Sequence, residues 1–271
     1  DTRNARIGAA MNIEIHGTGR AAGALAIAAS RADHAFVGVH GRSGAVAKPF
    51  ESHVTIADGQ PVLRNIAVSD RAIGQVAESL VGAAPVPTVH VSGAEPVTVL
   101  EALASSAQTG SFHPLQTLPT PEAGANRLAG AWIGITAQEP LAGALVELAE
   151  SMGCRPFFIA DEQKALYHAA AAAVANFTLA SMAIADVLYK ASGVPFEASR
   201  PLVEAIAANA YDLGPREALT GPIARGDVET VAKQVEAVRV GVPNDFDAFL
   251  GFARATALVA GTSDEMGEAL Q

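Results

Sequence analysis

The chain has 271 residues, of which 50% are hydrophobic and 17% are charged, and its formal net charge is -10. This length favours two domains over one, and the composition is that of a globular protein, which excludes disordered and fibrous classes. The negative charge argues against a nucleic acid or an anionic membrane surface as a partner, so a phosphate-bearing ligand needs a local basic pocket.

Residues 1–10 precede Met11 and carry no charged segment followed by an apolar one, so they do not have the pattern of a secretory signal. We interpret them as a disordered extension of the folded chain. The single cysteine, Cys154, cannot form an intramolecular disulfide, which suits a reducing compartment and a cytoplasmic protein. We expect its thiol to lie in the core.

Residues 11–160 alternate short β-branched runs with helical segments such as 21–31 and 72–81. This alternation predicts an α/β Rossmann domain, a doubly wound and mostly parallel sheet that binds ligands at the carboxyl ends of its strands. Arg64 and Asn65 interrupt an apolar run, so we expect the third strand to be short and to begin after them. The expected strands span 12–16, 35–40, 66–69, 88–92, 110–112 and 132–136.

Residues 161–271 have long alanine-rich segments with few strand signals, punctuated by glycine and proline, and predict a bundle of helices. The stretch from Ala169 to Ala185 is weakly polar, but Asn176, Thr178 and Ser181 interrupt it. Alanine adds little hydrophobicity, so this stretch predicts a helix buried inside the protein and no membrane span.

A glycine-rich turn lies between the first expected strand and the first expected helix. Gly17 and Gly19 allow a close approach of the backbone to a pyrophosphate, and the following helix points its free N–H groups at the same place. Thr18, Arg20 and Ala21 belong to the same turn. A glycine-rich turn without a ligand is the alternative.

The second expected strand ends in His40-Gly41-Arg42-Ser43 and has no carboxylate there. An NAD site needs an acidic residue at this place for the ribose 2′-OH, whereas Arg42 and Ser43 suit a 2′-phosphate. The sequence therefore predicts NADP (NADPH) as the cofactor; a solvated surface arginine is the alternative.

Short segments with polar residues follow the next expected strands and are placed to contact the nicotinamide side of the same crevice. They are Ser69 and Asp70, Ser92 and Gly93, and Ser111-Phe112-His113-Pro114. His113 is expected just after a strand, with Pro114 fixing the next backbone torsion. It either contacts the substrate or the cofactor, or serves only the turn.

Together these motifs resemble the Rossmann-like NADP-dependent reductases whose C-terminal helical domain is of unknown function. This group lies within the superfamily of 6-phosphogluconate dehydrogenase, pyrroline-5-carboxylate reductase and ketopantoate reductase. The resemblance runs from about Met11 to the C-terminus. It rests on GTGRAAG at 17–23, GRS at 41–43, HVSGA at 90–94, GSFHPLQTLP at 110–119, ALYHAAAAAVANF at 165–177 and ALTGPIARGD at 218–227.

The resemblance implies an oxidoreductase with a 6-phosphogluconate-dehydrogenase C-terminal-like helical domain that holds a small-molecule substrate and forms a homodimer. The first candidate substrate that the resemblance implies is a 2-oxo acid, 2-dehydropantoate (ketopantoate), which would be reduced to pantoate. The alternatives are an imine reductase of the pyrroline-5-carboxylate type and a non-catalytic NADP-sensing or scaffold protein.

Related dehydrogenases carry Lys-x-x-x-Asn at the start of the first long helix of the second domain, where this sequence has Lys164 and His168. Either Lys164 is the acid and His168 replaces the asparagine, or His168 is the acid and Lys164 is a solvated residue of the first turn. We favour His168, because its apolar flank predicts partial burial and an unperturbed imidazole titrates near neutral pH. Asn176, further along the helix, points either into the same cleft or into a helix contact.

Thr220-Gly221-Pro222 and Arg225 resemble the group's glycine–proline signature at the substrate end, where Arg225 suits a substrate carboxylate. A salt bridge from Arg225 to Asp227 or to another acid is the alternative. None of the seven histidines lies in a metal-ligand spacing such as H-x-x-x-H, and no cysteine cluster is present, so we expect no metal site.

Overall fold

The computed structural model describes residues 10–41, 54 and 56–270. Residues 1–9, most of the expected extension, lie outside the described residues, as do Arg42 and Ser43. The chain divides into two compact units, Asp1–Ala172 and Ala173–Gln271. Lys164 and His168 therefore belong to the first unit, together with the sheet.

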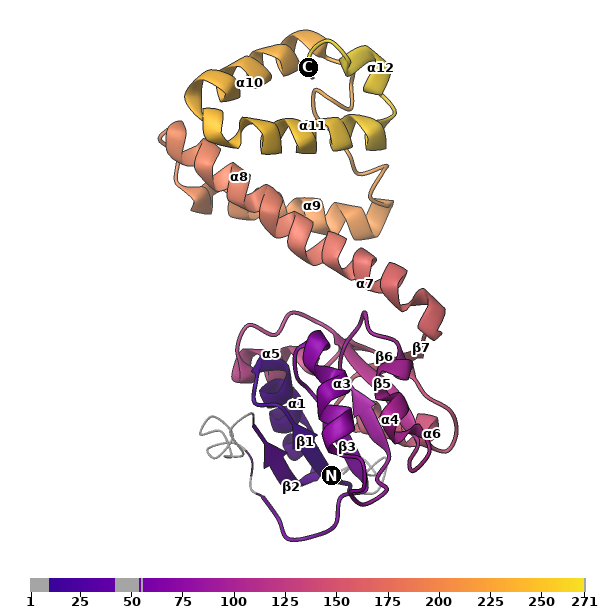
Figure 1. Cartoon of the computed structure of the whole chain (residues 1–271). Coiled ribbons are helices and arrows are strands. Elements are labelled where there is room, and N and C mark those ends of the chain that lie inside the picture. The colour runs from indigo at the N-terminus through magenta and orange to yellow at the C-terminus, as the bar shows by residue number, and fades with distance from the viewer. Residues whose placement is uncertain (1–9, 42–53, 55, 271) are drawn as a thin grey trace. The chain divides into compact units, whose positions relative to one another are not determined.

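A seven-stranded sheet in the order β2-β1-β3-β4-β5-β6-β7 forms the centre of the first unit (Figure 1). Neighbouring strands are parallel except for the antiparallel pair β5–β6. This confirms the predicted α/β class with a mostly parallel sheet. The strands are β1 Asn12–His16, β2 Ala35–His40, β3 Leu63–Ile66, β4 Thr88–His90, β5 Thr109–Leu115, β6 Trp132–Thr136 and β7 Arg155–Phe158.

Helices cover the sheet and bury two apolar clusters. The larger cluster packs α1 and α6 against strands β1, β5 and β6, and the smaller one packs α3 and α4 beside Ile66. Cys154 lies in the larger cluster, as predicted, and burial raises the pKa of its thiol to about 11. The helices are α1 Arg20–Arg31, α3 Asp70–Ser79, a 3₁₀ turn Val97–Leu100, α4 Glu101–Ala104, α5 Pro121–Leu128, α6 Leu141–Ser151, a 3₁₀ turn Asp161–Gln163 and α7 Lys164–Ala172.

The third strand differs from the prediction. β3 begins before Arg64 and includes Asn65, and the two side chains are only 4% and 5% exposed. The Arg64 Nε donates to Glu14 Oε2 on β1 at 2.6 Å, so the buried charge has an ionic partner. The rule that a buried parallel strand is uniformly apolar fails here because a cross-strand ion pair replaces an apolar contact.

Two further strand boundaries were wrong, and one strand was not predicted. β4 ends at His90, and β5 continues to Leu115, which places His113 within a strand and not after one. The antiparallel partner β6 extends β5 beyond its apolar part. β7 was not predicted because its four residues RPFF carry no alternating pattern.

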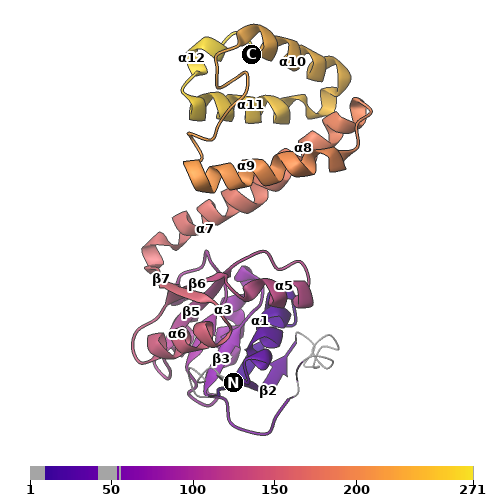
Figure 2. The same cartoon turned by 180° about the vertical axis from the view of Figure 1, so that it is seen from behind.

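The second unit is helical, as predicted. Its core cluster lies between α10, α11 and α12, which are side by side in both views, and includes Val231, Leu250 and Met266 (Figures 1 and 2). Its helices are a π-helical turn Ala173–Phe177, α8 Thr178–Ala191, a 3₁₀ turn Phe196–Ser199, α9 Arg200–Leu213, α10 Val228–Gly241, a 3₁₀ turn Pro243–Asp245, α11 Phe246–Ala260 and α12 Ser263–Met266.

The helical stretch Asp161–Ala191 differs from the expectation of a buried helix. Its most apolar window has a mean hydropathy of 1.6, and 0% of that window is buried within the chain. Among the described residues it alone is long and apolar enough to cross a membrane, a criterion that core helices of soluble proteins also meet. Its apolar side chains are thus exposed or only partly buried within the chain.

Candidate active site

Gly17 and Gly19 form the turn between β1 and α1. Gly17 has a φ of +129°, and a Cβ built on it would lie 2.1 Å from the Ala67 carbonyl oxygen. Its N–H donates to the His40 carbonyl at 2.8 Å, which fixes the turn against β2. Only glycine fits this position, because any side chain would overlap the backbone after β3.

Gly19 plays a different part in the turn. It is the N-cap of α1 and provides no side-chain cap, and a Cβ added to it would meet no neighbouring atom within 4 Å. Open space therefore lies before the first N–H groups of the helix. Uncapped N–H groups and the positive end of the helix dipole attract an anion. The turn therefore fits the pyrophosphate of a dinucleotide, as the sequence predicts.

A cavity of about 1320 Å³ opens over this turn, at the carboxyl ends of β1, β2 and β3. The strand order reverses about β1, the place at which doubly wound sheets bind nucleotides. Asp70, Ser92 and Gly93, which were also predicted, do not line the cavity. The predicted residues that line it are Gly17, Thr18, Gly19, Arg20, Ala21, Ser69, His113 and Pro114.

A second group of side chains gathers where β4, β5 and α7 meet. Tyr167 Oη and His113 Nδ1 share a hydrogen bond of 2.8 Å, and the rings of His113 and His168 lie edge to face with centroids 5.9 Å apart. Lys164 is only 1% exposed, and its Nζ has no hydrogen-bond partner among the described residues. The alternative of a solvated Lys164 is therefore wrong, whereas His168 is half-buried as expected.

Burial and the repulsion between like charges shift the pKa values of Lys164, His113 and Tyr167. Burial lowers the pKa of Lys164 to about 8, against the opposing effect of Asp161, whose Oδ1 lies 3.9 Å from Nζ. Burial, with the charges of His168 and Lys164, lowers the pKa of His113 to about 4. Burial raises the pKa of Tyr167 to about 12. At neutral pH the group thus combines a buried ammonium with a neutral His113 and a neutral phenol.

His113 and His168 lie directly against Gly93, at a place where a side chain would overlap them. A Cβ on Gly93 would lie 2.7 Å from His113 Nε2 and 2.8 Å from His168 Nδ1. The His168 Nδ1 is buried and has no hydrogen-bond partner among the described residues. Gly93, predicted as a cofactor contact, is thus placed by the structure under the histidines.

Sequence reasoning missed His90, the last residue of β4. The side chain is 0% exposed, and its Nδ1 accepts a hydrogen bond from the Ser92 N–H at 3.2 Å. Burial, followed by the charge of Lys164, lowers its pKa to about 3, so it is neutral at physiological pH. Its place at the end of an apolar run, next to the predicted Ser92, was the signal that could have identified it.

The other predicted site residues lie in the second unit. Asn176 is exposed and sits within the π-helical turn, which changes the angular spacing expected for a regular α-helix. Thr220 and Pro222 line a smaller cavity of about 310 Å³ beside α8 and α11, and Gly221 has a φ of +101°. Their roles toward a substrate stay predictions.

Arg225 is exposed, and no ion pair with Asp227 forms within the described part of the chain. Asp227 instead caps α10, accepting a hydrogen bond from the Thr230 N–H at 3.1 Å. The guanidinium of Arg225 therefore stays available for an anionic ligand.

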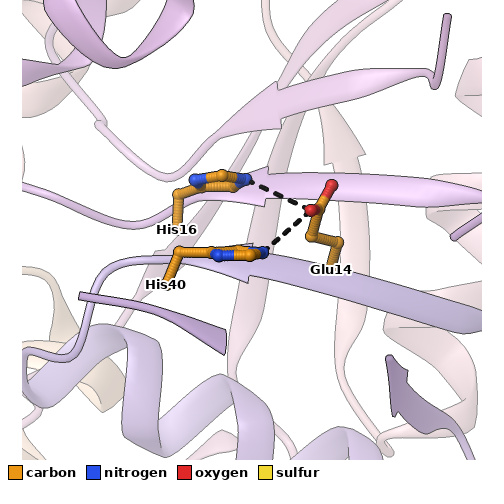
Figure 3. A group of neighbouring side chains, drawn as sticks. All are labelled: Glu14, His16 and His40. Carbon is orange, nitrogen blue, oxygen red and sulfur yellow. Dashed lines mark hydrogen bonds and ion pairs between the residues drawn. The ribbon is translucent and has the colours of Figure 1, made fainter. Parts of the chain in front are cut away.

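A third group was not predicted at all. Glu14, His16 and His40 come together at the ends of β1 and β2, with the two imidazole rings stacked and both facing the carboxylate (Figure 3). The spacing of these residues in the sequence does not reveal the group, because parallel strand pairing across β1 and β2 creates it. The alternation of Glu14 and His16 on one face of β1 was the available signal.

Residues 131–256 match the family model described as a domain of unknown function (DUF2520). No curated protein matches the chain.

Several solved structures share the fold. A Bacteroides fragilis protein described as a candidate NADP oxidoreductase is 23% identical with a TM-score of 0.76, covering 92% of this chain and 98% of its own. A Thermotoga maritima protein is 22% identical with a TM-score of 0.67, covering 90% and 98%. A reductive aminase from Aspergillus terreus, in complex with NADPH and ethyl levulinate, is 17% identical with a TM-score of 0.60, covering 97% and 91%. The chain thus has the fold of these three proteins over nearly its whole length.

Proposed function

We propose that this protein is an NADPH-dependent oxidoreductase that reduces a small 2-oxo acid, with 2-dehydropantoate (ketopantoate) as the first substrate to test. The observation that carries the proposal is that the first unit combines a nucleotide-sized cavity with a pair of candidate proton donors. The glycine turn opens into a cavity large enough for a dinucleotide, and a buried ammonium lies with a half-buried histidine at the ends of β4 and β5.

The residues of the turn fit the cofactor. The backbone at Gly17 and Gly19 and the N-terminus of α1 would hold the pyrophosphate, with Arg20 beside it, and Arg42 and Ser43 would hold the 2′-phosphate. When bound, the cofactor supplies the hydride that a carbonyl reduction needs. Fold similarity to structures solved with NADPH supports this choice.

His168 is the group that we assign as proton donor. It is half-buried, so one edge of its ring stays reachable, whereas Lys164 is almost fully enclosed. Lys164 then supplies a fixed positive charge near the oxygen that becomes negative in the reaction, an effect that is strong in a site that excludes water. Arg225 is the proposed partner of the substrate carboxylate.

Reduction of an imine is the second candidate. Three of the similar structures contain a reductive aminase and another an imine reductase, all from Aspergillus terreus and solved with a nicotinamide cofactor. An iminium ion already carries its proton, so this reaction would depend less on His168 than the reduction of a ketone does. A His168→Asn variant separates the two cases.

The first experiment follows NADPH oxidation by the purified protein with ketopantoate, pyrroline-5-carboxylate and simple 2-oxo acids. We expect saturable turnover of ketopantoate that falls by about 10²–10⁴-fold in His168→Asn. Turnover only with the imine, unchanged in His168→Asn, would replace the first candidate with the second. Tight NADPH binding without turnover of any of these compounds would refute both.

Cofactor choice has its own test. Arg42→Ala should weaken NADPH binding and leave NADH binding unchanged, because NADH has no 2′-phosphate for the guanidinium to contact. Arg71→Ala, on the exposed first turn of α3, is the matched control. An unchanged ratio of the two affinities in Arg42→Ala would exclude this arginine from cofactor selection.

We further propose that the protein is a cytoplasmic homodimer assembled through the helical unit. Large apolar side chains of this unit are exposed in the single chain, among them Phe177 at 63% and Leu202 at 57%. A monomer seldom leaves so many large apolar side chains uncovered within one helical unit. A second copy of the chain would cover these side chains, which explains the apolar stretch Asp161–Ala191 without a membrane.

A further inference from the structure

The geometry points to a divalent-cation site for zinc or a similar transition metal, formed by Glu14, His16 and His40 on β1 and β2 (Figure 3). The inference goes beyond the proposed reduction, which needs no metal, and it opposes the expectation of no metal site drawn from histidine spacing. Two imidazoles and one carboxylate are a ligand set that zinc uses in proteins.

The distances between ligand atoms suit one ion. His40 Nε2 lies 2.9 Å and His16 Nε2 lies 3.7 Å from the same oxygen, Glu14 Oε1, and all three ligand atoms lie within 4.8 Å of one another. A tetrahedral zinc ion with bonds of about 2.0–2.1 Å separates its ligand atoms by about 3.3 Å. The two distances to Oε1 lie on either side of this separation, but the rings are stacked at 19°, so one ring has to turn before both nitrogen lone pairs point at one ion.

The two histidines differ in how freely they can move. The His16 side chain is 12% exposed, and its Nε2 is buried without a hydrogen-bond partner within the described chain, a state that an ion would relieve. The His40 side chain is 47% exposed, so its ring can tilt out of the stack with His16, in which the centroids are 4.4 Å apart. His40 therefore makes the adjustment that brings both nitrogen lone pairs onto one ion.

A hydrogen bond from Arg64 fixes the carboxylate of Glu14 in the position that a ligand needs. Arg64 Nε occupies Oε2 at 2.6 Å and leaves Oε1 to the histidines. Such an outer partner orients a ligand, but its positive charge also repels the ion, so we expect weaker binding than in a structural zinc site.

Gly38 on β2 makes room for this arrangement. A Cβ there would lie 2.8 Å from His40 Nε2 and 3.4 Å from Glu14 Cγ. In the metal-free protein His40 Nε2 donates its proton to Glu14 Oε1. Metal binding therefore requires this proton to move to Nδ1 of a neutral ring, or to leave for solvent from a charged one.

The test is a titration of the tag-free full-length chain with Co²⁺, whose visible absorption reports tetrahedral nitrogen and oxygen ligands, followed by displacement with Zn²⁺. We expect saturation at one ion per chain, a rise in the unfolding temperature on adding Zn²⁺, and at least tenfold weaker binding in His40→Ala. Because the His40 ring is half exposed, this variant should fold, which its unfolding temperature without metal checks.

Matched variants locate the ion. Gly38→Ala should weaken binding through the crowding of His40, whereas His168→Asn, at the other histidine group, should leave the Co²⁺ spectrum and affinity unchanged. Loss of binding in His168→Asn with binding retained in His40→Ala would place the ion elsewhere and overturn the inference. No saturable Co²⁺ or Zn²⁺ binding by the wild type would also overturn it and leave the group as a polar network between strands.

Discussion

Gly93 lies under His168 so closely that a methyl group on it would sit 2.8 Å from the imidazole Nδ1. The same methyl group would lie 2.7 Å from His113 Nε2, so one substitution displaces both rings. Misplacement of catalytic groups by about 1 Å costs up to about 100-fold in rate. Gly93→Ala should therefore lower kcat by about 10- to 100-fold.

The affinity for NADPH is measured beside kcat, because Gly93 does not line the cavity over the glycine turn, whereas His113, which the methyl group would displace, does. Gly251→Ala on α11 is the matched substitution, since no atom lies within 4 Å of its Cβ position. We expect it to leave kcat unchanged. A Gly93→Ala enzyme with wild-type kcat would show that the histidine pair tolerates displacement or takes no part in the reaction.

Lys164→Met should lower activity and raise stability together. The substitution removes a buried ammonium that has no hydrogen-bond partner among the described residues, so turnover should fall by about 10²–10³-fold through the lost positive charge. The unfolding temperature should rise by about 2–4 °C, as for a gain of about 1 kcal/mol in a chain of this size. Lys190→Met, at an exposed pair with Asp186, should change neither quantity appreciably. A decrease in stability would mean that the attraction of Asp161 outweighs the cost of burying the Lys164 charge.

The pKa of Lys164 predicts how pH affects rate and stability. With a pKa of about 8 the ammonium loses its charge as the pH rises through that value, so kcat should decline there, and Lys164→Met should lack this decline. The folded pKa lies below the ordinary 10.5, so the unfolded chain binds more protons between these values. The stability of the wild type should therefore rise relative to Lys164→Met from about pH 8 toward 10.5, as measured by denaturant unfolding.

Gly17→Ala and Gly19→Ala should separate folding from cofactor binding. The first places a methyl group 2.1 Å from the Ala67 carbonyl oxygen at a φ of +129°, which should cost about 3 kcal/mol of unfolding free energy. The second adds a methyl group in open space, so the protein should fold normally but bind NADPH at least about tenfold more weakly. Equal NADPH affinity of Gly19→Ala and wild type would contradict the proposed place of the pyrophosphate.

Phe177→Glu should dissociate the proposed homodimer. Phe177 is 63% exposed in the single chain, and burying a carboxylate in an apolar interface is costly. Sedimentation at several concentrations should show a dimer for the wild type and a dissociation constant at least about tenfold higher for the variant. Val81→Glu, 61% exposed in the first unit, is the control expected to stay dimeric. A wild type that sediments as a monomer would refute the assembly.

Local sequence patterns were enough to predict the α/β class, the glycine turn and the helical second part. These features depend on short-range rules: β1, β2 and β6 have the predicted bounds because their β-branched runs end at clear turn signals. The turn at Gly17 was recognisable because a φ of +129° requires glycine whatever surrounds it. A helix over 169–185 was predicted too, but the exposure of the observed stretch Asp161–Ala191 depends on neighbours that no local pattern describes.

The sequence by itself determined which side chains are available and on which elements they lie; the tertiary structure decided which of them meet. From the sequence, Lys164 could be either the acid or a solvated residue of a first helical turn, whereas the folded chain encloses it and its burial lowers its pKa. Glu14 and His40 are far apart in the chain, and only the parallel register of β1 and β2 brings them to 2.9 Å. Burial and cross-strand contact are properties of the folded chain, because they arise from residues that sequence spacing does not relate.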